Sequence, residues 1–251
     1  MSRRPIIAGN WKMHITVPEA AALVDGLLPG CRGRADVEVI LGPAFTALHA
    51  VSARVAGTGI GVAAQNMYHE PKGAFTGEVS PGMLKDAGCT HVLIGHSERR
   101  QYFGETDGLL NKKLFAALDN GITPIFCIGE TLDERESGRA FEVIAKQLDG
   151  GLDGFTPEQA GKIVVAYEPV WAIGTGKTSS PEQAQEVHAF IRGRLKEKFG
   201  DVSASIRILY GGSVKPDNVK DLMSREDIDG ALVGGAALKA DSFQALVDFN
   251  K

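Results

Sequence analysis

The stretch from Ile163 to Phe199 reads IVVAYEPVWAIGTGKTSSPEQAQEVHAFIRGRLKEKF, and it contains one full unit of the pattern that decides the fold. It begins with a short apolar run, passes through a loop that contains glycine, and continues into a helical pattern. Ser180, Pro181 and Gln183 form an N-cap, a first-turn proline and a capping-box partner, so they predict a helix that runs to about Phe199. The unit is therefore a strand followed by a capped helix.

The same alternation recurs along the whole chain in both directions from this unit. Near-continuous apolar strands separated by helices indicate a parallel sheet that is buried on both faces. Eight alternations in 251 residues fit a closed α/β barrel of eight parallel strands. A doubly wound sheet usually has fewer strands and a glycine fingerprint after the first one, which is absent here. The predicted strands are Ile6–Gly9, Val37–Leu41, Ile60–Ala64, His91–Ile94, Thr123–Ile128, Ile163–Ala166, Ile206–Tyr210 and Ala231–Val233.

Bulk properties support one soluble domain over residues 1–251. Hydrophobic residues make up 43% and charged residues 23% of the chain, which is ordinary for a globular protein. The net charge of -4 is spread without a long like-charged run, so we expect no nucleic-acid partner. No apolar run approaches the length needed to span a membrane, and the apolar stretch after the basic start is too short for a signal peptide.

Cysteine usage indicates a reducing compartment, and we expect the protein to be cytoplasmic. The three cysteines are far apart and form no CxxC pair, which argues against a metal cluster. We find no metal-ligand spacing to carboxylates or cysteines at His14, His49, His69, His91 or His188, so we predict no metal.

Polar residues and glycines follow five of the predicted strands. In a β/α barrel the reacting groups project from the carboxyl ends of the strands, because the loops that follow converge there above a packed interior. A cation, an imidazole, a carboxylate and two glycine turns are therefore expected on one rim. The residues are Asn10 and Lys12, then His96, Ser97 and Glu98, then Glu168, then Gly211, Gly212 and Ser213, and finally Gly234 and Gly235.

These residue types together favour an isomerisation of a phosphorylated sugar. Glycine turns after strands seven and eight are the usual phosphate site of such barrels, and Lys12 adds a full positive charge. Glu168 is a candidate general base, which contributes roughly 10² to 10⁴ in rate. Because enzymes usually reach about 10⁶ or more, an electrophile must share the work. Neutral His96 could donate a hydrogen bond to a carbonyl that becomes an enediolate, a contribution of about 3 to 4 kcal/mol.

Each of these residues has a plainer interpretation when it is taken alone. An isolated histidine followed by Glu is usually structural, and a lysine such as Lys12 is most often a solvated surface charge. Glu98 could simply hold Lys12 in place. The GKT at 176–178 does not form a nucleotide-binding loop, because the motif needs glycine where this chain has Trp171.

Five motifs resemble the triosephosphate isomerase family, in that family's order and over nearly the whole chain. The thirteen residues AYEPVWAIGTGKT are the most specific of them. The motifs are GNWKM at Gly9–Met13, GHSERR at Gly95–Arg100, AYEPVWAIGTGKT at 166–178, YGGSV at Tyr210–Val214, and the turn at Gly234 and Gly235.

The resemblance implies a TIM barrel that interconverts dihydroxyacetone phosphate and D-glyceraldehyde 3-phosphate through an enediolate, in glycolysis and gluconeogenesis, with no cofactor. It implies Glu168 as the proton-shuttling base and His96 as a neutral electrophile, an assignment for which this family is the standard example. Lys12 would lie beside the substrate phosphate and carbonyl, and Asn10 would help to orient the substrate. A short helix from Ser97 could supply the dipole that keeps His96 uncharged.

The resemblance also implies a closing lid over 169–178, with Gly174 N–H meeting the phosphate and with Ser213, Gly234 and Gly235 completing the anion site. The lid residues are Pro169, Val170, Trp171, Ala172, Ile173, Gly174, Thr175, Gly176, Lys177 and Thr178. Glu130 could brace this lid near Trp171, or it could be a surface or cap residue.

Two positions depart from the family pattern. The resemblance gives the lid a second hinge at 177–179, and Ser179 stands where this hinge usually ends in alanine. Ala236 stands where the turn after strand eight often has serine. Neither supplies a reacting group, so they bear on lid kinetics.

The connection from Gln65 to Val79 resembles an arm that inserts into a partner subunit, with Thr76 near the partner active site. It implies a homodimer. The alternatives that stay open are a different phosphosugar isomerase on the same barrel and a barrel that binds a phosphosugar without turnover.

Overall fold

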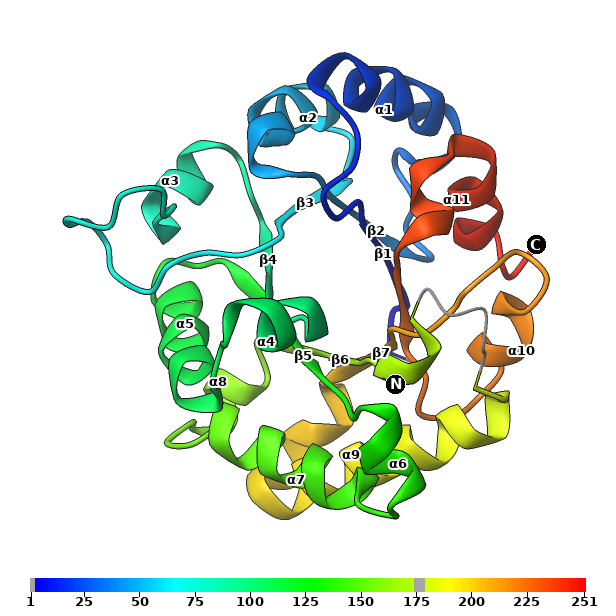
Figure 1. The fold of residues 1–251 in the computed structure, drawn as a ribbon. Helices are drawn as coiled ribbons and strands as arrows, with labels where there is room; N and C mark the ends of the chain where they lie inside the picture. The colour runs from blue at the N-terminus through cyan, green and yellow to red at the C-terminus, as the bar shows by residue number, and fades with distance from the viewer. Residues whose placement is uncertain (1–2, 174–178) are drawn as a thin grey trace.

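Eight parallel strands form the centre of the protein. The computed structural model describes residues 3–173 and 179–251, and in it each strand pairs with the next along the chain while β8 pairs with β1 (Figure 1). The predicted closed barrel is confirmed, and no strand end differs from its predicted run by more than one residue. The strands are β1 (Ile6–Asn10), β2 (Glu38–Gly42), β3 (Gly61–Ala64), β4 (His91–Ile94), β5 (Thr123–Ile128), β6 (Val164–Tyr167), β7 (Arg207–Tyr210) and β8 (Gly230–Val233).

Helices surround the strands as an outer layer (Figure 1). They are α1 (Val17–Cys31), α2 (Leu48–Val55), α3 (Pro81–Asp86), α4 (Ser97–Phe103), α5 (Asp107–Asp119), α6 (Leu132–Glu136), α7 (Ala140–Gly151), α8 (Pro157–Ala160), α9 (Pro181–Phe199), α10 (Val219–Met223) and α11 (Ala240–Val247). Four short 3₁₀ turns complete the described elements: η1 (Phe45–Ala47), η2 (Val170–Ala172), η3 (Gly200–Ser205) and η4 (Gly235–Leu238).

The capping chemistry of α9 follows the sequence closely. The Ser180 side chain accepts from the Gln183 N–H while the Gln183 side chain accepts from the Ser180 N–H, which satisfies two of the free donors at the helix start. The helix ends at Phe199, as predicted. Reciprocal bonds of this kind need only nearby residues, so the sequence alone reveals them.

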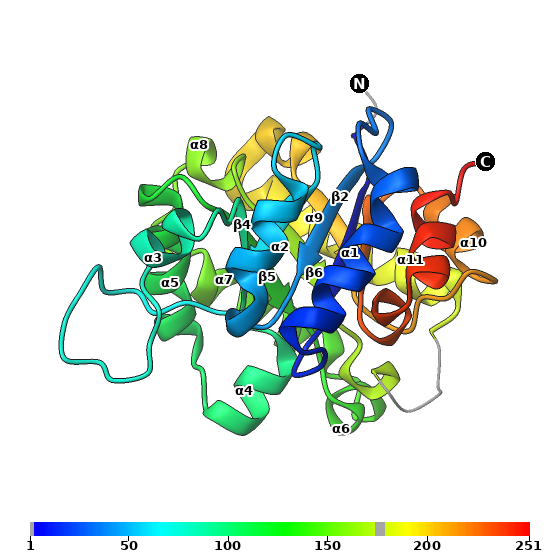
Figure 2. The ribbon, with the colours of Figure 1, turned by 90° about the horizontal axis from the view of Figure 1, so that it is seen from above.

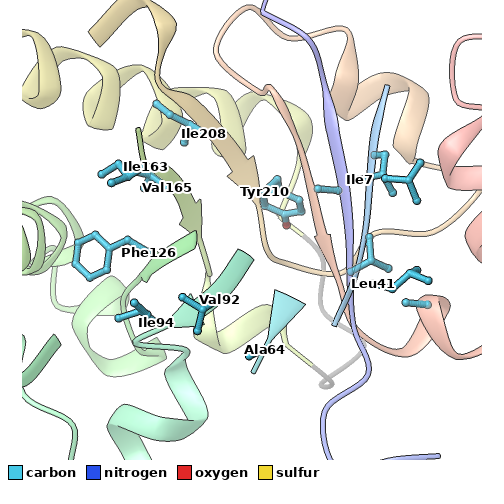
Figure 3. Packing of buried hydrophobic residues seen from close by; sticks show 14 of the residues in the cluster. Ile7, Leu41, Ala64, Val92, Ile94, Phe126, Ile163, Val165, Ile208 and Tyr210 are labelled. Atoms are coloured by element: carbon cyan, nitrogen blue, oxygen red, sulfur yellow. The ribbon is translucent and has the colours of Figure 1, made fainter. Parts of the chain in front are cut away.

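Two apolar layers hold the barrel together. Within β1, the side chains of Ile6 and Ala8 belong to a cluster inside the barrel, whereas Ile7 packs in the larger cluster between strands and helices. Figure 3 shows Ile7, Phe126 and Ile208 of this larger cluster, directed away from the barrel axis toward the helices. Because successive side chains of a strand point to opposite faces, both faces must be apolar, and this explains the continuous apolar runs.

His188 on α9 is a fully buried titratable group that packs against the tyrosines at the ends of β6 and β7. Its ring lies edge-on to Tyr167, with 5.8 Å between ring centroids, and its Nδ1 lies 3.1 Å from the Asp227 carbonyl oxygen. Burial lowers the pKa of His188 to about 4. In the unfolded chain the His188 imidazole therefore becomes protonated below about pH 6.5, whereas in the folded chain it stays neutral down to about pH 4.

We expect this difference to cost stability in acid. Between about pH 6.5 and 4.5 the free energy of unfolding should fall by about 2 kcal/mol through His188 alone. Urea unfolding of His188→Phe should show a shallower pH dependence than the wild type, while His49→Phe, at an exposed position, should keep the wild-type slope. An unchanged slope in His188→Phe would contradict the buried neutral imidazole.

Candidate active site

A cavity of about 350 Å³ opens at the carboxyl ends of the strands. Nine of the rim residues predicted from the sequence line it, although they follow five strands that are far apart in the sequence, and Ile173 of the predicted lid lines it as well. The nine are Asn10, Lys12, His96, Glu168, Gly211, Gly212, Ser213, Gly234 and Gly235. The predicted phosphate contact at Gly174 and the lid residues at 175–178 lie outside the described residues.

Glu168 follows β6 and His96 follows β4, and their side chains meet in the wall of this cavity. His96 Nε2 lies 2.9 Å from Glu168 Oε1, and the second carboxylate oxygen accepts the Ser97 N–H at 2.9 Å. Both side chains are buried, with 2% of Glu168 exposed. The carboxylate is therefore held at the first turn of α4 by two donors.

Burial and charge act in opposite directions on this pair. Burial favours the neutral acid at Glu168, but attraction to His96 and the Ser97 hydrogen bond prevail, and the pKa of Glu168 is lowered. Burial favours the neutral imidazole at His96, but attraction to the Glu168 carboxylate prevails, and the pKa of His96 is raised. The charge on His96 thus depends on where the Glu168 carboxylate lies.

The other ring nitrogen of His96 has a partner that favours the neutral form. The Glu98 N–H points at His96 Nδ1 across 3.2 Å, so this nitrogen accepts and carries no proton. A neutral ring with its proton on Nε2 presents a donor toward the cavity.

Lys12 reaches the same cavity from the loop after β1. Its Nζ pairs with Glu98 Oε1 at 2.6 Å, so Glu98 holds Lys12 in place. The backbone of Lys12 has a φ of 51°, which is unusual for a residue with a side chain. The Gln65 amide supports this backbone, because its Nε2 donates to the Lys12 carbonyl at 2.8 Å and to the Gly42 carbonyl at 2.9 Å.

The turn after β7 approaches Glu168 closely. A Cβ on Gly211 would lie 2.9 Å from Cγ of Glu168, and a Cβ on Gly212 would lie 2.2 Å from the Tyr210 hydroxyl oxygen. Only glycine fits at these two positions, so the backbone comes within reach of the cavity. Ser213, Gly234 and Gly235 line the same cavity.

The sequence and the fold are similar to those of known proteins. The model of the triosephosphate isomerase family matches residues 5–250. The chain belongs to this family. It is 59% identical to the triosephosphate isomerase of Citrifermentans bemidjiense over 250 residues, which cover 99% of this chain and 100% of the relative. It is 58% identical to the triosephosphate isomerase of Trichlorobacter lovleyi over 248 residues, which cover 98% of this chain and 99% of the relative.

A solved structure gives the same result. The crystal structure of triosephosphate isomerase from Bartonella henselae superposes with a TM-score of 0.89 at 41% identity, covering 98% of each chain. Membership of the triosephosphate isomerase family makes the chain an isomerase with a role in glycolysis, as the sequence motifs predicted.

Glu130 holds the first residues of the predicted lid in place. This carboxylate is fully buried, and one oxygen accepts from the Tyr167 hydroxyl and from Trp171 Nε1, both at 3.0 Å. Its backbone carbonyl accepts the Val170 N–H at 3.1 Å. The sequence left two roles open for Glu130, and its contact with Trp171 supports the role of holding the lid rather than that of a surface or cap residue.

Sequence reasoning missed Gln65, although a signal was present. Gln65 follows β3 directly, so the rule that polar residues at strand ends belong to the site would have included it. His14 and Lys215 also line the cavity and were not predicted as site residues. Among residues 3–173 and 179–251, no group of three or more histidine, cysteine or acidic side chains is arranged to hold a metal ion.

Proposed function

We propose that Glu168, His96 and Lys12 carry the interconversion of dihydroxyacetone phosphate and D-glyceraldehyde 3-phosphate. The observation that carries this proposal is the 2.9 Å contact between the Glu168 carboxylate and His96 Nε2 in the wall of a cavity that Lys12 also lines. The two sugars are isomers, so the reaction needs a base and an electrophile but no oxidant or reductant.

The proton moves in two steps in this proposal. Glu168 takes a proton from C1 of dihydroxyacetone phosphate, and the electron pair of the broken C–H bond forms the C1–C2 double bond of the enediolate. His96 donates from Nε2 to the carbonyl oxygen that becomes negative. The Glu168 proton then returns to C2. His96, which has given its Nε2 proton to the oxygen on C2, takes up the hydroxyl proton from the oxygen on C1, so that this oxygen becomes the aldehyde and the ring regains its proton.

Substrate binding has to separate Glu168 from His96. The carboxylate accepts from His96 and from the Ser97 N–H, so it must give up both bonds to reach a substrate carbon. Once it turns away, the attraction that raises the pKa of His96 weakens, and the Glu98 N–H favours the neutral ring. The neutral imidazole then donates a hydrogen bond from Nε2–H to the substrate.

Lys12 and the glycine turns hold the phosphate in this proposal. The Lys12 ammonium faces the cavity beside Asn10, and the turns at Gly234 and Gly235 offer backbone donors. Residues 169–178 close over the substrate as a lid, which excludes water and keeps the enediolate from losing phosphate by elimination. Each opening of this lid breaks the hydrogen bond from Trp171 Nε1 to Glu130, and the bond forms again afterwards.

Replacing Lys12 with methionine is expected to weaken phosphate binding by about ten- to a hundredfold, because a charge-assisted hydrogen bond is lost. Calorimetric titration with inorganic phosphate measures this loss. Lys162→Met is the matched control, since Lys162 also pairs with a glutamate at 2.7 Å but lies on the surface. Equal affinity in Lys12→Met and Lys162→Met would remove Lys12 from the phosphate site.

We further propose a homodimer through the arm from Gln65 to Val79. The arm projects from the barrel in both ribbon views (Figures 1 and 2). Phe75 on the arm is 40% exposed and packs on Tyr68 with 4.6 Å between ring centroids. Three further apolar side chains are more exposed still: Met83 at 59%, Phe103 at 66% and Met13, beside Lys12, at 94%. Exposed apolar groups of this size favour a protein interface, with Thr76 near the partner active site.

The dimer is tested by sedimentation at several protein concentrations. The wild type should sediment at twice the chain mass of 26.7 kDa, and Phe75→Glu should shift toward the monomer and lose turnover. Phe141→Glu is the control, because Phe141 is 36% exposed but packs on Phe190 of α9. A wild type that sediments as a monomer at all concentrations would exclude the dimer.

Within the described parts of the chain, none of the helices has the length and apolar character that crossing a membrane requires. We propose a cytoplasmic location, which suits a glycolytic enzyme and three buried free thiols.

A further inference from the structure

A second polar pocket, of about 430 Å³, lies at the opposite end of the barrel. Figure 2 shows α8 at one end of the barrel and α4 and α6 at the other. We name this hollow the arginine pocket. It is lined by Arg3, Arg4, Gly161, Asp201, Ala204, Ser205 and Arg207.

Two of its guanidinium groups are paired with carboxylates that are not among the lining residues. Arg3 pairs with Asp229 and also donates to the Glu226 carbonyl at 2.7 Å. Arg207 pairs with Glu38 through one terminal nitrogen at 2.5 Å. A guanidinium has five N–H donors, so the single contact to Glu38 leaves most of the donors of Arg207 free for another acceptor.

Arg4 differs because no carboxylate among residues 3–173 and 179–251 lies within ion-pair distance of it. One of its terminal nitrogens donates to the carbonyls of Arg34 at 2.7 Å and of Val37 at 2.8 Å. These neutral acceptors hold the side chain in place without balancing its charge. Asp201 is the one carboxylate among the described residues that line the pocket, and it is exposed.

We propose that the arginine pocket binds a phosphate-type oxyanion, either inorganic phosphate or the phosphate group of a small ester. Arg4 and Arg207 offer forked donors that match such an anion, and Ser205 adds a hydroxyl. Because the whole chain carries a net charge of -4, attraction to the anion is local to these side chains. A bound anion stabilises the fold by mass action, since the unfolded chain has no such pocket.

The reaction proposed above does not use this site, and the two sites can be observed separately. In ¹⁵N NMR spectra of the labelled protein, inorganic phosphate should shift the Gly161, Ala204 and Ser205 amides along a saturable curve. Acetate at equal ionic strength should shift them much less, because it offers a single charge on two oxygens. Amides of the Gly212 and Gly235 turns report the active site independently.

Three variants test the assignment of the side chains. Arg4→Gln should weaken phosphate binding at these amides by about tenfold, which corresponds to one lost charge-assisted contact. Asp201→Asn should strengthen it, because the variant removes the opposing charge. Arg139→Gln should leave it unchanged, since Arg139 is an exposed arginine that lies outside the pocket.

The proposal fails if the Ala204 and Ser205 amides do not move at phosphate concentrations that saturate the active-site amides. It also fails if Arg4→Gln binds as tightly as Arg139→Gln. Should Arg4→Gln not fold, Asp201→Asn decides, because unchanged affinity in that variant contradicts an anion held in the arginine pocket.

Discussion

Replacing Glu168 with glutamine is expected to lower kcat by roughly 10³-fold or more, which lies within the range that a positioned general base contributes. Glutamine keeps the size of the side chain and can still accept the Ser97 N–H, so the fold should persist. The amide cannot take a proton from carbon at ordinary pH. Phosphate affinity should therefore stay close to that of the wild type while turnover is lost.

A coupled assay of aldehyde formation measures this loss. Glu158→Gln is the control, because Glu158 is 81% exposed on α8 and lies outside the cavity. Turnover in Glu168→Gln at the level of Glu158→Gln would assign the base to another residue.

Replacing His96 with glutamine is expected to lower kcat by about 10²- to 10³-fold, the usual cost of one well-aimed donor to a developing oxyanion. Glutamine can still offer an N–H, but it cannot keep the fixed direction that the Glu98 N–H gives to the ring. Because Glu168 and His96 act on the same proton transfer, the double variant should lose less than the product of the two single effects.

His14→Gln is the matched control for this experiment, since His14 lines the same cavity as an exposed histidine. Equal kcat values in the His14 and His96 variants would show that the imidazole of His96 does not act on the substrate.

The strands and capped helices could be predicted from the sequence because their causes are local. A capping box such as Ser180 with Gln183 spans four residues, and an apolar run such as His91–Ile94 shows its burial directly. Pro216 shows the limit of the same reasoning, which predicts a helix with this proline just inside its start. A proline there is compatible with a first helical turn, but the Asn218 side chain accepts the Lys215 N–H and closes a turn, so α10 begins at Val219.

The sequence predicts which strand ends carry the site residues, but it does not predict which of their side chains are in contact. The barrel brings His96 and Glu168 to one rim, which follows from topology alone. Their contact at 2.9 Å, and its effect on both pKa values, depends on side-chain directions that no sequence pattern contains. The arginine pocket was missed for a similar reason, because Arg4 and Ser205 come to line one pocket only through the closure of β1 onto β8 and the placement of η3.

Hydrogen exchange at the substrate tests the central claim most directly. The protein is incubated with dihydroxyacetone phosphate in heavy water, and the C1 hydrogens are followed by NMR. Proton abstraction by Glu168 predicts that deuterium enters at C1 and that glyceraldehyde 3-phosphate appears, and that both signals are lost in Glu168→Gln. A bound substrate with no exchange at C1 and no aldehyde would contradict it.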